Sequence, residues 1–132
     1  MNNPATKRMA DFMPVEMKPE QALKLVHEVA LGLVGLARAD AMDDFTLRQL
    51  AILFTVYLEQ PPHTVRGLAA RLAVTKPVIT RALDAMSQYQ LVNRRRDEAD
   101  RRNMIIQRTV KGALYVEKLG DLVVAKGMGM NR

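Results

Sequence analysis

Two long segments near the ends of the chain carry apolar residues at helical spacing. Over residues 18–38, and again over residues 110–126, these residues cover most of the helical circumference. One small core does not need helices that are apolar on so many sides, so the excess predicts dimerisation helices that bury it against a second subunit. The residues expected in this dimer interface are Leu23, Val26, Leu33, Leu114, Leu119 and Leu122.

Shorter elements lie between these two segments. Residues 46–59 have the pattern of an amphipathic helix that begins at Thr46, and two adjacent prolines follow it. A short helix over about residues 64–72 and a longer one from Thr75 come next, separated by a tight turn. Residues 1–17 contain two prolines and no sustained period, which predicts a flexible N-terminal arm.

A charged hairpin is predicted after the second of these helices. Leu91 and Val92 start one extended segment, Met104 starts another, and the polar loop RRRDEADRRN separates them. Two short helices followed at once by a basic hairpin are typical of a winged helix-turn-helix, here at residues 61–109. The predicted fold is therefore mainly α with a small β-hairpin. We expect a single domain over residues 18–132, in which N- and C-terminal dimerisation helices flank the winged helix-turn-helix.

The positive charge is concentrated in one part of the chain. The net charge is +6, yet residues 1–60 hold 6 Lys/Arg against 8 Asp/Glu, whereas residues 61–132 hold 14 against 6. This asymmetry favours a polyanionic partner, because neutralised phosphates release condensed counterions. Charge alone leaves RNA, an anionic membrane or mere solubility open.

Composition removes several other classes of function. The chain has no cysteine, which excludes disulfides, thiolate metal sites and thiol redox sensing, and its two isolated histidines make no convincing metal site. We find no nucleophile and base pair, phosphate loop or convergent acid pair, so we expect neither an enzyme nor a cofactor. No apolar run reaches the roughly 18 residues that a membrane span requires, and no secretory signal is present, so we expect a cytoplasmic protein with no membrane partner.

The candidate DNA contacts lie on the second short helix and on the hairpin. The helix has an apolar stripe and an opposite polar face, from which side chains can reach base edges or phosphates in the major groove. The hairpin, or wing, can reach the adjacent backbone or minor groove. The predicted helix contacts are Thr75, Lys76, Pro77, Thr80 and Arg81, and the predicted wing contacts are Arg94, Arg95, Arg96, Arg101 and Arg102.

The two short helices and the wing resemble those of a known protein family. The string LAARLAVTKPVITRALDAM resembles the helix-turn-recognition-helix pattern of the MarR family of bacterial regulators, and LVNRRRDEADRRNMIIQRTVKG resembles its wing. The resemblance implies a homodimer on double-stranded DNA, with Arg101 or Arg102 in or beside the minor groove. It also implies that Asp97 and Asp100 fasten wing arginines rather than act in catalysis.

The chain departs from the family pattern at two places in this region. Gln90 stands where the family usually has glycine, and Arg108 stands where it usually has an apolar residue. Many relatives also release DNA when a small molecule binds between the dimerisation region and the DNA-binding lobe. For such an effector we would look near Leu33, Leu36, Phe54 and Tyr57, for which core packing is the alternative use.

The function that these observations favour is a sequence-specific regulator of transcription that binds double-stranded DNA. We expect a dimeric repressor on a pseudo-palindromic operator, with relief by a small ligand as a further option. The alternative is a winged-helix protein-interaction module whose basic face docks an acidic partner. The sequence names neither the operator nor the effector.

Overall fold

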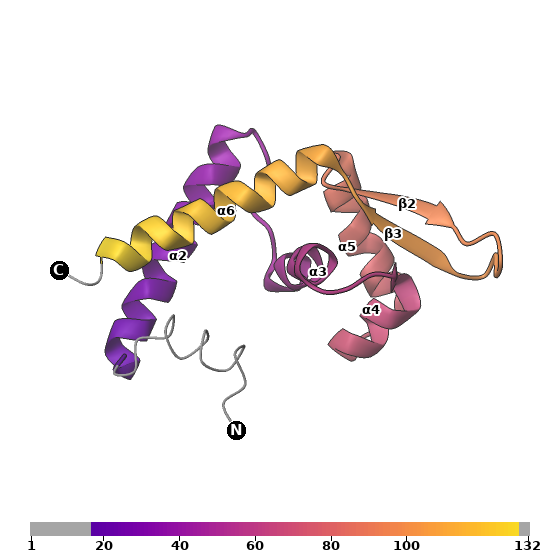
Figure 1. Ribbon diagram of the computed structural model, residues 1–132, viewed down its shortest axis with the longest axis horizontal. Helices are drawn as coiled ribbons and strands as arrows, with labels where there is room; N and C mark the ends of the chain where they lie inside the picture. The colour runs from indigo at the N-terminus through magenta and orange to yellow at the C-terminus, as the bar shows by residue number, and fades with distance from the viewer. Residues whose placement is uncertain (1–16, 130–132) are drawn as a thin grey trace, which may run out of the picture.

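The computed structural model describes residues 17–129 and separates a winged-helix lobe from a pair of long helices (Figure 1). Its elements are α2 (Pro19–Ala39), α3 (Leu47–Leu58), β1 (His63–Thr64), α4 (Val65–Leu72), α5 (Lys76–Gln88), β2 (Val92–Arg96), β3 (Met104–Arg108) and α6 (Val110–Gly129). The mainly helical fold with a small sheet is confirmed. The predicted N-terminal arm, except for Met17, lies outside the described residues.

Local capping explains where the middle helices begin. The Thr46 hydroxyl accepts the N–H of Gln49 at 3.1 Å, and the Gln49 side chain accepts the N–H of Thr46 at 2.8 Å, a reciprocal capping box. Thr64 accepts the N–H of Gly67 at 2.9 Å and starts α4 in the same way. Thr75 occupies the position before α5, but its side chain makes no capping hydrogen bond there.

The sheet has three antiparallel strands in the order β1, β3, β2. The predicted hairpin is formed by β2 and β3, with Val92 opposite Arg108 at its base and Arg96 opposite Met104 near its tip. The short strand β1 pairs with Ile105 and Ile106 and was not predicted. It anchors the wing to the segment that enters α4.

The core of the winged-helix lobe lies between α3, α5 and the sheet. Its fully buried large side chains are Ile52, Leu53, Val56, Ile79, Leu83, Met86 and Leu91. Each buried aliphatic side chain of this size contributes about 1.5–3 kcal/mol relative to an exposed one. The apolar stripe of α5 is therefore committed to the core, which leaves the opposite face of this helix at the surface.

The two long helices pack against each other and keep much of their apolar surface exposed. Leu23 is 70% exposed, Val26 63% and Leu114 56%, as the dimer prediction requires. Leu119 does not fit that prediction. It is 2% exposed and belongs to the buried core of its own chain. Leu122 packs on Gly32 of α2 in the same chain.

Candidate nucleic-acid interface

A tight turn between α4 and α5 sets the orientation of the exposed face of α5. Ala73 adopts the left-handed conformation, with φ 55° and ψ 46°, and the N–H of Val74 donates to the carbonyl of Ala69 at 3.0 Å. Leu68 and Ala69 are buried where α4 meets α5. The first helix thus braces the second, and Lys76, Thr80 and Arg81 remain exposed.

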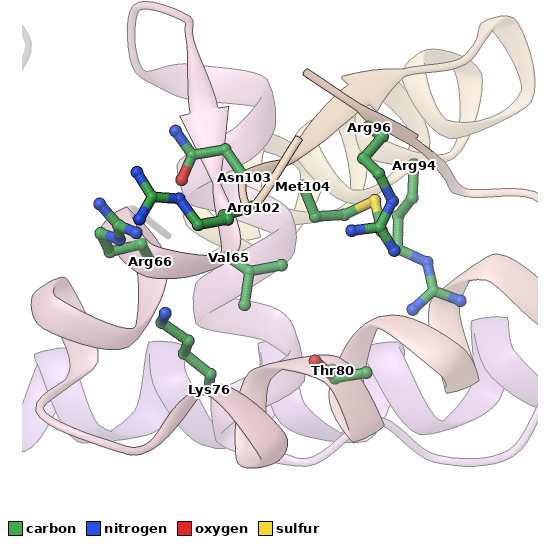
Figure 2. Close-up of a pocket in the computed structure, with 9 residues that line it drawn as sticks. All are labelled: Val65, Arg66, Lys76, Thr80, Arg94, Arg96, Arg102, Asn103 and Met104. Atoms are coloured by element: carbon green, nitrogen blue, oxygen red, sulfur yellow. The ribbon is translucent and has the colours of Figure 1, made fainter. Parts of the chain in front are cut away.

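A basic cleft of about 200 Å³ lies between α4, α5 and the wing (Figure 2). Lys76 and Thr80 of α5 line it together with Arg66 of α4, and the wing supplies three arginines. Figure 2 shows the Lys76, Arg66 and Arg102 heads on one side and Arg94 and Arg96 on the other. The complete lining is Val65, Arg66, Lys76, Thr80, Arg94, Arg96, Arg102, Asn103 and Met104. Such a concentration of cations favours an anionic ligand.

Arg94 joins the wing to α5. Its guanidinium lies 2.8 Å from a carboxylate oxygen of Asp84, and its side chain is 27% exposed. This ion pair joins β2 to α5, and the DNA contact expected of Arg94 stays a prediction. Asp84 therefore pairs with the wing, while Arg81 of the same helix donates its Nε to the Pro77 carbonyl at 3.4 Å.

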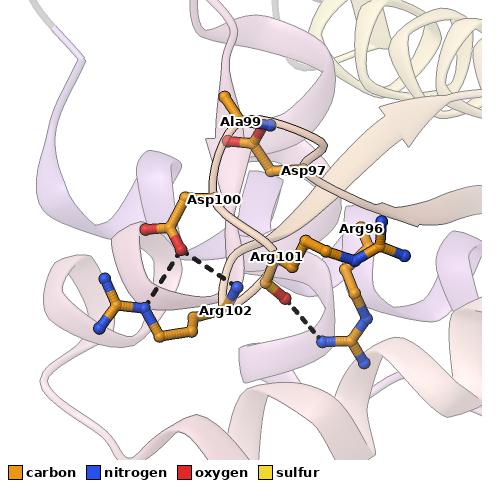
Figure 3. Close-up of polar contacts among 6 residues, drawn as sticks. All are labelled: Arg96, Asp97, Ala99, Asp100, Arg101 and Arg102. Atoms are coloured by element: carbon orange, nitrogen blue, oxygen red, sulfur yellow. Dashed lines mark hydrogen bonds and ion pairs between the residues drawn. The ribbon is translucent and has the colours of Figure 1, made fainter.

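The wing tip is closed by hydrogen bonds that involve both predicted fasteners (Figure 3). Oδ1 of Asp100 accepts the backbone N–H of Arg102 at 3.1 Å and its Nε at 3.2 Å, so Asp100 does hold an arginine. Asp97 instead accepts the N–H of Ala99 at 2.9 Å and shapes the turn. Arg96 spans the tip, since its Nη1 donates to the Arg101 carbonyl at 2.8 Å.

Two wing arginines have side chains that are not engaged elsewhere. Arg95 and Arg101 are exposed and form no ion pair or side-chain hydrogen bond within residues 17–129. Arg66 shares this exposure and was missed at the sequence level. The available signal was its place in the first turn of α4, the helix that precedes α5.

A second, apolar cavity of about 280 Å³ separates the long helices from α3. Its lining consists of Val26, Val29, Ala30, Leu33, Val34, Ala37, Asp44, Phe45, Leu47, Leu50 and Tyr115. Of the residues suggested for an effector site only Leu33 is among them, while Leu36, Phe54 and Tyr57 pack against the core. Burial raises the pKa of the Tyr115 phenol, and the negative charge of Asp40 adds to this.

The described residues offer neither a membrane-spanning helix nor a metal-binding cluster. Across residues 17–129, no helix is both long and apolar enough to cross a membrane. The same stretch contains no group of three or more His, Asp or Glu side chains placed to hold a metal ion.

Comparisons with known proteins agree with this geometry. Residues 45–104 match the model of the MarR family. The search of curated proteins gives no match. Solved structures that resemble the chain include a mutant of MepR from S. aureus, with 19% identity, a TM-score of 0.67, and coverage of 98% of this chain and 82% of that one.

Two other solved structures also resemble the chain. The transcriptional regulator BldR from Sulfolobus solfataricus is 26% identical, with a TM-score of 0.55 and coverage of 87% of this chain and 85% of that one. Overoxidized AbfR bound to DNA is 21% identical, with a TM-score of 0.59 and coverage of 92% and 82%. The first of these proteins is a transcriptional regulator, and the second was solved in complex with DNA. Residues 45–104 therefore form a MarR-family domain, and the chain as a whole has the winged-helix fold of these solved structures.

Proposed function

We propose that the protein is a homodimeric regulator of transcription that binds double-stranded DNA in a sequence-specific manner. The observation that carries this proposal is the basic cleft, in which cations from α4, α5 and the wing converge beside the exposed face of a helix. A MarR-family domain and structural neighbours that regulate transcription or are bound to DNA support the same function. An α-helix with one polar face fits the major groove, where base edges are distinguishable.

The recognition helix and the wing have separate tasks in this proposal. Thr80 and Arg81 lie on the exposed face of α5 and contact base edges, while Lys76, with Thr75 and Pro77 beside it, meets the backbone at the helix start. The wing then supplies charge to the neighbouring phosphates or minor groove. Arg95 and Arg101 are free to do so, and Arg102 is held in place for it by Asp100.

The dimer and its control rest on the long helices. Leu23, Val26 and Leu114 are exposed apolar side chains of these helices. Helix α2 lies away from the wing, with α6 running along it (Figure 1). A two-fold dimer formed there presents two recognition helices to half-sites one helical turn apart. The apolar cavity beside Phe45 and Tyr115 supports repression that a small apolar effector relieves by binding there.

The salt dependence of binding tests the role of the wing. Each neutralised phosphate contributes about 0.9 to the slope of log K against log salt. The double substitution Arg101→Ala and Arg102→Ala removes up to four such contacts from a dimer, so the slope should become shallower by roughly 3 to 4. Affinity for selected and random duplexes should fall together, because phosphate contacts carry no sequence information.

The matched control is the double substitution Arg38→Ala and Arg48→Ala, which removes the same charge from a different surface. Arg38 and Arg48 are exposed and lie in α2 and α3, outside the basic cleft. Fluorescence anisotropy titrations between about 0.05 and 0.2 M salt would measure both double variants. An unchanged slope in the wing variant, or an equal change in the control, would contradict the assignment of the wing.

A further inference from the structure

Arg108 joins two segments of the winged-helix lobe that lie 52 and 49 residues apart in the sequence. It is the last residue of β3 and pairs with Val92 at the base of the wing. Its Nε donates to the Val56 carbonyl at 2.7 Å and its Nη2 donates to the Glu59 carbonyl at 2.8 Å. The guanidinium thus joins the end of the wing to the end of α3.

The C-terminus of α3 is well suited to receive this cation. The helix ends at Leu58, and although the Glu59 N–H still donates to the Thr55 carbonyl, the carbonyls that follow lack amide partners further along the helix. The helix dipole also places partial negative charge there. A guanidinium satisfies two separate carbonyls with charge-assisted hydrogen bonds, which an apolar side chain at position 108 cannot make.

Tyr57, in the last turn of α3, also holds the base of the wing. The Tyr57 hydroxyl donates to the carbonyl of Leu91, just before β2, and accepts the N–H of Thr109, just after β3, at 2.6 and 3.0 Å. The Arg108 guanidinium lies 6.0 Å from the centroid of the Tyr57 ring. Tyr57 therefore fixes where the two strands meet α3, and Arg108 fixes the outer side of the junction.

We propose that Arg108 is a positioning residue for DNA binding, which holds the wing at the angle where its arginines meet DNA. The inference rests on the proposed function and adds a residue that does not itself touch DNA. The five residues of β2 span about 16 Å, so a rotation of about 10° at the base would move the tip by ~3 Å. A displacement of that size breaks hydrogen bonds between the wing and the nucleic acid.

The test compares Arg108→Met with the wild-type protein on a duplex that the wild type selects. Methionine keeps the length of the side chain and removes both hydrogen bonds. If the wing then occupies its binding position for only about a tenth of the time, apparent affinity falls about tenfold. Hydroxyl-radical protection should weaken at the outer edges of the site, where the wing lies, while the central protection from α5 persists. A general loss of folding would weaken both regions together.

Two further variants complete the design. Arg108→Lys keeps the charge and one donor group and should bind with intermediate affinity. Lys111→Ala removes an exposed charge three residues further along the chain and should leave affinity within about twofold of wild type, since this side chain forms no ion pair within residues 17–129. Should Arg108→Met not fold, the same footprint of Arg108→Lys decides the question.

The outcomes separate this inference from the proposed function. Wild-type binding together with an unchanged affinity and footprint for Arg108→Met would overturn the positioning role alone. A uniform loss of protection across the site would overturn it as well. A wild-type protein that protects no duplex would remove the proposed function, and this inference with it.

Discussion

Replacing Gly112 by alanine should destabilise the protein much more than the same replacement at Gly120 of the same helix. A Cβ at Gly112 would overlap the Tyr57 hydroxyl and the carbonyl oxygen of Leu91. The carbonyl belongs to the main chain and cannot rotate away, so either α6 shifts or Tyr57 leaves its place. A Cβ at Gly120 meets no atom within 4 Å.

The expected difference follows from the contacts at the two positions. Overpacking costs about 1–3 kcal/mol, and each hydrogen bond of Tyr57 that is lost costs about 1 kcal/mol. Alanine regains up to about 1 kcal/mol of helix propensity at either site. The free energy of unfolding should therefore fall by roughly 2–4 kcal/mol for Gly112→Ala and stay level or rise slightly for Gly120→Ala.

Urea unfolding at one fixed protein concentration would measure both variants, because the proposed dimer would make stability depend on concentration. The slope of the transition should match that of the wild type, which shows that the same surface unfolds. If the two glycine variants were equally stable, the close approach of α6 to Tyr57 and Leu91 would not be rigid, and the reasoning about the wing base would fail.

Two further substitutions probe single residues. Gln90 has a φ of 60°, a left-handed conformation that costs a residue with a side chain about 1–2 kcal/mol. Gln90→Gly should therefore raise the free energy of unfolding, measured in urea, by about 1 kcal/mol. A lower free energy of unfolding would show instead that the Gln90 side chain stabilises the turn. The raised pKa of Tyr115 favours the protonated phenol in the folded state, so stability should be lost as pH rises above about 10, the pKa of a tyrosine in the unfolded chain. Tyr115→Phe should remove this part of the decline in stability. Identical pH profiles of stability for the variant and the wild type would contradict this prediction.

The features that the sequence predicted well are those set by neighbouring residues. Thr46 caps the helix that follows it because a threonine hydroxyl reaches an N–H three residues away. The turn in the polar loop of the wing also depends on hydrogen bonds between neighbouring residues, such as the one from the Arg102 N–H to the Asp100 carboxylate. Helical spacing likewise identified the buried stripe of α5.

The features that it missed depend on contacts between distant segments. Strand β1 is only two residues long and exists because β3 offers it a pairing edge. The ion pair of Arg94 with Asp84 and the contacts of Arg108 with α3 join residues that spacing alone cannot bring together. Periodicity marked Leu119 as apolar, but only packing shows that its own chain already covers it.

A selection of duplex DNA from a randomised library, with purified protein at about 0.15 M salt, tests the central claim most directly. The account predicts an enriched inverted repeat whose half-sites lie one helical turn apart, the spacing of two recognition helices in a symmetric dimer. A bound pool with no preferred sequence would contradict sequence-specific regulation. It would leave nonspecific charge binding and favour a protein-interaction module that docks an acidic partner on the basic cleft.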